Sequence, residues 1–249
     1  MKFLLVFIML TFVESVKAQQ NNLVEYSIQF KDNTNDKQSE YLVFNLEKLV
    51  YANISNSDNL NFEDEKLDKS SFQYEPLFFD LKNDSVYQLK IGIFDPKSSD
   101  LTRFVAGEKT PKLDWKLTKE TKKILNYICY KATTKFRGRD YIAWFTPEIA
   151  HNYGPWKLNG LPGLILKAET DLFSYEAKRI VLNSDKIPNL DYLFNLKNAK
   201  VIHTLKESFD YENNWLEYQM ANFVASLPSG AIMQEVPLRN NSREFTLDE

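Results

Sequence analysis

The sequence holds little of several residue types on which whole classes of protein depend. Its 249 residues include one cysteine, Cys129, so no intramolecular disulfide can form. There are only 7 glycines and 9 prolines, which argues against a collagen-like or linker-rich chain, and no repeat at a fixed period indicates a solenoid. The formal net charge is −3, which provides no sequence-wide positive field for nucleic acid or anionic lipid.

The sequence is rich in the apolar and aromatic residues that fill a protein core. Hydrophobic residues make up 43% of the chain and aromatic residues 14%. A chain of this length and composition buries enough apolar surface to fold without disulfides. The composition therefore predicts one compact globular domain.

The first eighteen residues have the pattern of a secretory signal peptide. Lys2 precedes an apolar run over residues 3–13, and Ala18 closes a cleavage site with small or β-branched residues. A membrane anchor is the alternative, but the run is about half of the ~20 apolar residues that a hydrocarbon core requires. We expect cleavage after Ala18 and a protein that is exported to the periplasm or associated with the outer membrane. The predicted domain then spans residues 19–226, and residues 227–249 form an irregular tail.

Alternating apolar and polar residues predict strands along most of the chain. Residues 23–31 alternate cleanly, with Val24, Tyr26 and Ile28 on one side. Hairpins are expected where β-branched and aromatic runs flank short turns, as at Arg137-Gly138. Residues 55–71 are expected to form a surface loop, and residues 118–124 a turn or helical corner. About ten strands result, over residues 23–31, 41–46, 48–54, 76–81, 85–93, 101–107, 111–116, 127–136, 139–145, 164–169 and 175–182. No βαβ alternation occurs, so the sheet should be antiparallel.

One helix is expected near the C-terminal end. Thr204 followed by Glu207 has the form of a capping box. A helical stripe of apolar residues should pack on the sheet, namely Leu205, Phe209, Leu216, Met220, Phe223 and Val224. The sequence thus predicts a mainly β fold: an antiparallel sheet, or a curved half-barrel, packed on one C-terminal helix.

Glycine and proline concentrate between residues 138 and 163. Proline fixes φ and glycine permits values that other residues avoid, so this segment should make consecutive tight turns before it enters a strand. The residues concerned are Gly138, Gly154, Gly160, Gly163, Pro147, Pro155 and Pro162.

The residues Gly160 to Ile165 read GLPGLI, the motif that names a family of exported proteins of Gram-negative bacteria, and the chain resembles that family over about sixty residues. The matching elements are Trp115, Tyr127 to Ala132, Phe136 to Arg139, Ala143 to Ile149, and Gly154 to Trp156. The resemblance implies the compartment and a β-rich fold, and it implies no biochemical activity. The order of hairpins and helix is also similar to curved half-barrels that carry lipoproteins, which is an analogy of topology.

Catalytic and metal-binding patterns are sparse. Cys129 lies mid-strand between Ile128 and Tyr130, which favours a buried structural thiol over a nucleophile. Glu148, beside Pro147, is the least arbitrary carboxylate for acid-base chemistry. No metal-ligand spacing occurs, and the acidic run Asp58, Glu63, Asp64, Glu65 and Asp68 lacks the glycine of a calcium loop. We therefore predict no catalytic residue, no metal site and no cofactor.

A candidate binding face surrounds the Gly/Pro segment. Tyr and Trp offer amphipathic contact area, and Arg139 can fix a carboxylate, a phosphate or a partner backbone. The other reading is that the tryptophans fill the core and the arginines solvate a turn. The predicted binding residues are Arg139, Trp144, Tyr153, Trp156, Gly160, Leu161, Pro162 and Gly163. Nothing is inferred for His151, and the triplet Asp84-Ser85-Val86 fits either an O-glycan acceptor at Ser85 or a simple turn.

These observations favour an exported, non-catalytic binding protein. Its partner would be an apolar ligand or an outer-membrane protein, to which residues 160–165 would dock. The alternative is a periplasmic hydrolase that uses carboxylates or Cys129.

Overall fold

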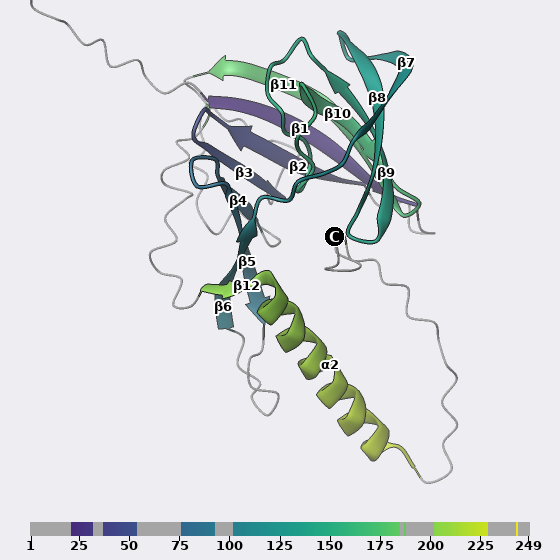
Figure 1. Ribbon diagram of the computed structural model, residues 1–249. Helices are drawn as coiled ribbons and strands as arrows, with labels where there is room; N and C mark the ends of the chain where they lie inside the picture. The colour runs from purple at the N-terminus through teal and green to yellow at the C-terminus, as the bar shows by residue number, and fades with distance from the viewer. Residues whose placement is uncertain are drawn as a thin grey trace, which may run out of the picture.

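A computed structural model describes residues 21–31, 37–53, 76–92, 102–184, 187, 202–228 and 243. They form one open 12-stranded sheet in the order β12-β6-β5-β4-β3-β2-β1-β11-β10-β9-β8-β7 (Figure 1). The strands are β1 (Asn21–Phe30), β2 (Lys37–Phe44), β3 (Lys48–Asn53), β4 (Leu77–Asp80), β5 (Ser85–Gly92), β6 (Thr102–Lys109), β7 (Lys116–Ile124), β8 (Tyr127–Phe136), β9 (Arg139–Thr146), β10 (Leu164–Glu169), β11 (Phe173–Ser184) and β12 (Ile202–Thr204).

The sheet is antiparallel except where β12 pairs with β6 in parallel. The predicted mainly β fold is confirmed, and so are the hairpins, because alternation and turn residues specify them locally. The strand count differs from the expected ten, and the expected segment 111–116 is wrong as a strand, because residues 111–115 form the connection before β7. Residues 118–124 were predicted as a turn or helical corner, and that prediction is wrong, because they belong to β7. This strand lies at the sheet edge with almost every side chain exposed, so it carries no alternating pattern.

Both faces of the central strands are apolar. Val24, Tyr26 and Ile28 of β1 enter the main hydrophobic cluster, whereas Leu23 enters a second cluster on the opposite face with Tyr41. We call the face of the main cluster the inner face. The segment between β9 and β10 covers this face with Trp156, Leu158 and Leu161, among others.

Ion pairs connect β6 to the turn between β8 and β9, which lies far from β6 in the strand order of the sheet. Glu108, on the inner face of β6, forms ion pairs with Arg137 in the turn between β8 and β9 and with Lys157 in the segment after β9. The Lys157 Nζ lies 2.5 Å from Glu108 Oε1, and the lysine side chain is only 1% exposed. We call these three residues the charged strap. It joins the part of the sheet that ends in β6 to the part that contains β8 and β9, and we call these two parts the arms of the sheet.

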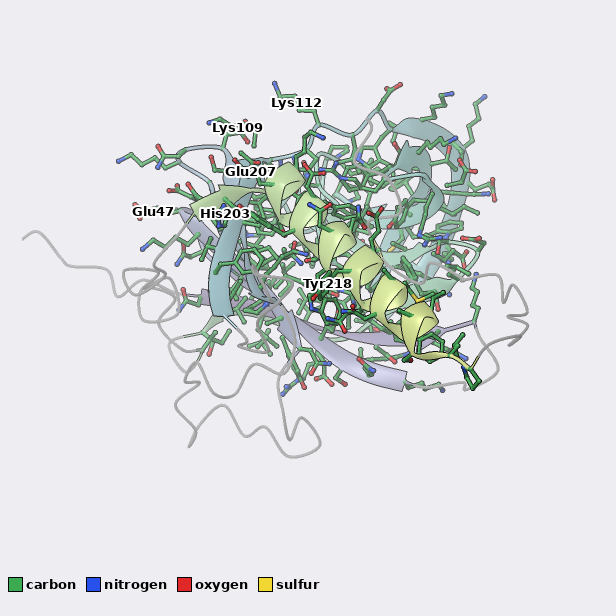
Figure 2. All side chains as sticks on the ribbon, turned by 90° about the horizontal axis from the view of Figure 1, so that it is seen from below. Glu47, Lys109, Lys112, His203, Glu207 and Tyr218 are labelled. Carbon is green, nitrogen blue, oxygen red and sulfur yellow. The ribbon has the colours of Figure 1, made fainter. Side chains whose placement is uncertain are left out.

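The helix α2 (Leu205–Ser226) begins with the predicted capping box: the Thr204 hydroxyl accepts from the Glu207 amide, and the Glu207 carboxylate accepts from the Thr204 amide. Its first turn packs Leu205 against Phe104 and Ala106 of β6. Figure 2 shows His203 and Glu207 at this end of the helix and Tyr218 farther along it.

The remainder of α2 projects from the end of the sheet formed by β5, β6 and β12 (Figure 1). Met220, Phe223 and Val224 are 48%, 55% and 50% exposed. The prediction that the whole apolar stripe packs on the sheet is therefore wrong for these three residues, and the side chain of Leu216 lies outside the described part. Among the described residues, no helix is long and apolar enough to cross a membrane.

Several predictions concern residues that the structure does not describe. These are the signal peptide at 1–18, the surface loop with its acidic run at 55–71, and the tail at 227–249 apart from residues 227, 228 and 243.

Candidate functional site: the loop between β9 and β10

Residues 147–163, the part of the Gly/Pro segment between β9 and β10, form a loop with one buried side and one exposed side. We call it the Gly/Pro loop. On the buried side, Ile149, Trp156, Leu158 and Leu161 enter the main cluster. Trp156 adopts a left-handed φ of 55° and stacks on Tyr141 with ring centroids 6.5 Å apart. Large aromatic and branched side chains removed from water contribute a stabilising term, which holds the loop to the sheet.

Two glycines of the loop are required by close backbone approaches. A Cβ at Gly163 would lie 2.1 Å from the carbonyl oxygen of Thr146, and the φ of Gly163 is +148°. A Cβ at Gly154 would lie 2.7 Å from the Cβ of Ile165. The close approaches explain Gly154 and Gly163 by the fold alone.

Backbone hydrogen bonds make the loop a fixed structure. The Gly160 amide donates to the Asn152 carbonyl at 2.8 Å, and the Ile165 amide donates to the Tyr153 carbonyl at 2.9 Å. Tyr153 and Asn159 also pair as an antiparallel bridge. Binding residues are commonly presented by loops that a rigid scaffold positions in this way.

Planar side chains and an amide flank Asn159 and Gly160 of the loop, and the two aromatic ones, Trp115 and Tyr153, pack partly against the main cluster. Trp115, in the connection before β7, donates its indole Nε1 hydrogen to the Asn159 carbonyl at 2.7 Å. Trp115 and Tyr153 are half-buried, whereas Asn152, Gly160 and Pro162 are exposed. We call these five residues the loop tip.

Tyr153 of the loop tip and the neighbouring His151 are held in uncharged forms. Burial, and secondarily the charge of Asp84, raises the pKa of Tyr153, so its hydroxyl stays protonated. The ring of His151 contacts Phe44 edge-on at 4.6 Å, and burial lowers its pKa. The loop tip therefore offers aromatic faces, a hydroxyl and an amide, and this set suits a neutral polar ligand.

The predicted binding residues divide between these two sides of the loop and strand β9. Tyr153, Gly160 and Pro162 lie at the loop tip, whereas Trp156 and Leu161 are buried beneath it and Gly163 sits at the backbone approach. Trp115 and Asn152 were not predicted as binding residues. What links Trp115 and Asn152 to the loop is their contact with Asn159 and Gly160, and the sequence alone does not reveal these contacts.

Arg139 and Trp144 of β9 are placed elsewhere. Arg139 is buried, with its Nη1 3.8 Å from the Asp171 carboxylate and its guanidinium 5.9 Å from the Phe173 ring. Lys122 lies over the Trp144 ring at 3.9 Å from the centroid, and burial followed by the charge of Lys167 lowers the pKa of this lysine. Both side chains make their contacts within the sheet and its turns.

The candidate catalytic groups occupy structural positions. Cys129 is fully buried, as predicted, and burial raises the pKa of its thiol to about 11. A Glu148 carboxylate oxygen accepts a hydrogen bond from the Ile128 amide at 2.9 Å. Ser85, the residue that fits either an O-glycan acceptor or a simple turn, is buried, and its hydroxyl donates to the Asn83 carbonyl at 3.0 Å. No group of three or more His, Cys, Asp or Glu side chains in the described part of the chain is arranged to hold a metal ion.

Comparison with known proteins gives a family and a fold. The family model of the N-glycanase peptide, N-terminal domain, matches residues 24–205. Two crystal structures of PNGF-II match with TM-scores of 0.54 and 0.53 at 23% and 22% identity; the matches cover 77% and 80% of this chain and 33% of each PNGF-II chain. The chain thus spans about a third of the length of PNGF-II, with which it shares a fold.

A LolA superfamily protein from Nitrosomonas europaea also matches, over 70% of this chain and 92% of its own, at 10% identity and a TM-score of 0.26. This similarity is too distant to support the analogy with lipoprotein carriers. No curated protein matches the chain.

Proposed function

The chain belongs to the N-glycanase peptide, N-terminal domain family, and from this membership we propose that it is an exported, non-catalytic domain that binds a protein-linked glycan. The match over residues 24–205 includes every strand from β2 to β12 and the whole Gly/Pro loop. The name of the family refers to an enzyme that acts on N-glycans, which is why the proposed ligand is a glycan of this class.

The loop tip is the observation that carries the proposal. Sugars present flat apolar faces between rings of hydroxyls, and amphipathic Trp and Tyr side chains complement such faces while planar amides bond the hydroxyls. Trp115, Tyr153 and Asn152 provide these groups within a hydrogen-bonded loop, so binding costs little ordering of the protein.

The buried side of the loop argues for a ligand at the surface rather than an apolar ligand inside the half-barrel. Trp156, Leu158 and Leu161 occupy the inner face at this end of the sheet. An acyl chain there would have to displace them. In the proposal, the partner is therefore a glycoprotein of the cell envelope, bound through its sugar.

The compartment forms part of the same proposal. Export to the periplasm or outer membrane is supported by the signal-peptide pattern of residues 1–18, and by the resemblance of residues 160–165 to the GLPGLI family. A hydrolase that uses Cys129 has little support, because a thiol with a pKa of about 11 is almost wholly protonated at neutral pH.

Calorimetric titration of the purified protein with a high-mannose N-glycan oligosaccharide tests the proposal. We expect binding with a Kd of about a millimolar or tighter, as for a small neutral ligand on an open surface. Asn152→Ala and Tyr153→Phe each remove one hydrogen-bonding group and keep the packing, so each should weaken binding about threefold to tenfold. Tyr130→Phe is the matched control, because Tyr130 is an exposed tyrosine of β8.

Two results would overturn the proposal. One is no heat of binding for the wild type, or equal affinities for the loop-tip variants and Tyr130→Phe. The other is release of the glycan from an N-glycopeptide during incubation, followed by mass spectrometry, which would establish a hydrolase.

A further inference from the structure

The inner face of the sheet carries a carboxylate in its central strands. Glu40 of β2 pairs in register with Tyr26 of β1, a residue of the main cluster, and its side chain is only 5% exposed. The Tyr51 hydroxyl, from the neighbouring β3, donates a hydrogen bond to Glu40 Oε2. A carboxylate at such a depth is costly in free energy unless a cation and hydrogen bonds compensate it.

The compensating cation comes from the other end of the chain. Arg243 lies 203 residues from Glu40 in sequence, and its Nη2 pairs with Glu40 Oε1. The arginine side chain as a whole is 26% exposed against 5% for the glutamate, so the carboxylate is the more deeply buried partner of the pair.

Aromatic side chains form the walls around this pair. The Arg243 guanidinium lies 5.6 Å from the centroid of the Tyr175 ring, on β11, within the range of a cation–π contact. Tyr51 and Tyr175 are both fully buried, and burial is the main cause that raises the pKa of each hydroxyl, so both stay protonated.

One polar atom of the aromatic side chains, the Tyr175 hydroxyl, makes no hydrogen bond within the described part of the chain. This hydroxyl is buried. Buried hydroxyls in folded proteins are nearly always hydrogen-bonded, so the pocket has more hydrogen-bonding capacity than Arg243 uses.

We propose that Glu40, Tyr51 and Tyr175 form a guanidinium-binding site on the inner face of the sheet, which accepts an arginine side chain of a polypeptide and which the chain's own Arg243 fills. A planar guanidinium has five donors in a fixed fork and stacks on aromatic rings, which matches a carboxylate, two hydroxyls and a tyrosine face. An ammonium lacks the fork and the planar surface, so the site distinguishes arginine from lysine.

Because Arg243 belongs to the same chain as the site, it competes with any arginine ligand in solution. A side chain on the same polypeptide competes at an effective concentration in the millimolar range. An arginine of another polypeptide therefore binds only when Arg243 has left the site. This site is separate from the glycan site at the loop tip, and the inference does not rest on the proposed function.

Removal of the internal occupant tests the proposal. The probes are N-acetyl-arginine amide and, as the control, N-acetyl-lysine amide, titrated into Arg243→Ala while the melting temperature and the heat of binding are measured. We expect the arginine amide to bind and to raise the melting temperature of Arg243→Ala, and to leave that of the wild type unchanged. The lysine amide should bind at least about tenfold more weakly. Adding Glu40→Gln or Tyr175→Phe to Arg243→Ala should weaken arginine binding, because each removes one group of the site.

A second measurement covers the case in which Arg243→Ala does not fold. Trypsin cleaves after arginine only when the side chain enters its own pocket, so cleavage after Arg243 should be slow in the wild type and faster in Glu40→Gln, whose amide retains the bond to Tyr51. Cleavage after Arg239 provides the internal reference. The proposal is overturned if Arg243→Ala folds and does not bind the arginine amide, if arginine and lysine amides bind equally, or if Glu40→Gln leaves the cleavage rate after Arg243 unchanged relative to Arg239.

Discussion

Gly163 lies where the loop turns into β10, and the absence of a side chain is what allows its backbone to pass Thr146. The distance of 2.1 Å between a Cβ built at Gly163 and the Thr146 carbonyl oxygen is far below any contact that real atoms make. Gly160, in the same loop, has a φ of +89°, but a Cβ there would lie 3.9 Å from the Trp115 ring, at ordinary contact distance.

These two glycines form a matched pair for mutation. Gly163→Ala combines backbone strain with a clash against main chain, and we expect a loss of about 4 kcal/mol or more in the free energy of unfolding. Gly160→Ala has only the backbone strain, which costs about 1 to 2 kcal/mol. Urea denaturation followed by circular dichroism measures both. Equal losses for the two variants would contradict the close approach at Gly163.

The thiol of Cys129 supplies a prediction that depends on pH. Because burial raises its pKa from 9.0 to about 11, the folded protein holds the thiol proton more tightly than the unfolded chain does. The contribution of this group to stability is therefore complete below about pH 9 and is lost as the pH rises to about 11.

The reactivity of the same thiol provides the measurement. At pH 8 only about one Cys129 in a thousand is ionised in the folded protein, so alkylation by iodoacetamide should be slow without denaturant and fast in urea. Cys129 is the single cysteine of the sequence, so intact mass reports it without ambiguity. Rapid alkylation of the native protein would show that the thiol is accessible and ionised.

At the scale of elements, the charged strap is the contact that joins the arms of the sheet. Glu108 stands between Arg137 and Lys157, and both cations are buried. Breaking a buried ion pair from one side leaves an uncompensated charge and costs more than the pair contributes when intact.

Glu108→Gln should therefore lower the free energy of unfolding by about 3 to 5 kcal/mol. Glu120→Gln is the control, since Glu120 is exposed on the edge strand β7 and pairs with Lys131 of β8, so the loss should be at most about 1 kcal/mol. The two variants are compared by urea denaturation at low salt. A difference within the error of the measurement would show that the strap does not hold the arms together.

How far the elements follow from the sequence depends on whether each has a buried face. β8 alternates because one side of the strand enters the core, and β1 keeps Val24, Tyr26 and Ile28 on the side of the main cluster. The start of α2 follows from the capping box of Thr204 and Glu207. β7 has eight of its nine side chains at least partly exposed, so its lysines carry no periodic signal. Three-residue β12 is too short for any pattern, and its parallel pairing with β6 joins segments that are distant in sequence, which local residue types do not specify.

At the scale of the whole molecule, the site follows from the sequence only in part. The Gly/Pro cluster predicts a loop of special geometry, and the structure agrees. The sequence does not show which side of that loop faces the core. Trp115, Trp144 and Trp156 are the same residue type and differ only in the side chains around them in the fold. The pairing of Arg243 with Glu40 across 203 residues leaves no local signal at all.

The central claim is that the loop tip binds a glycan, and the indole signals of the protein test it most directly. The sequence has four tryptophans, and each gives one resonance in a ¹H–¹⁵N correlation spectrum. Trp115 is the tryptophan at the loop tip; Trp144 and Trp156 are buried, and Trp215 lies on α2.

Titration with the high-mannose N-glycan oligosaccharide should shift the Trp115 indole signal in a saturable manner and leave the other three in place. Trp115→Phe assigns the signal. No shift at millimolar oligosaccharide, or a shift confined to another tryptophan, would contradict the assignment of the loop tip as the glycan site.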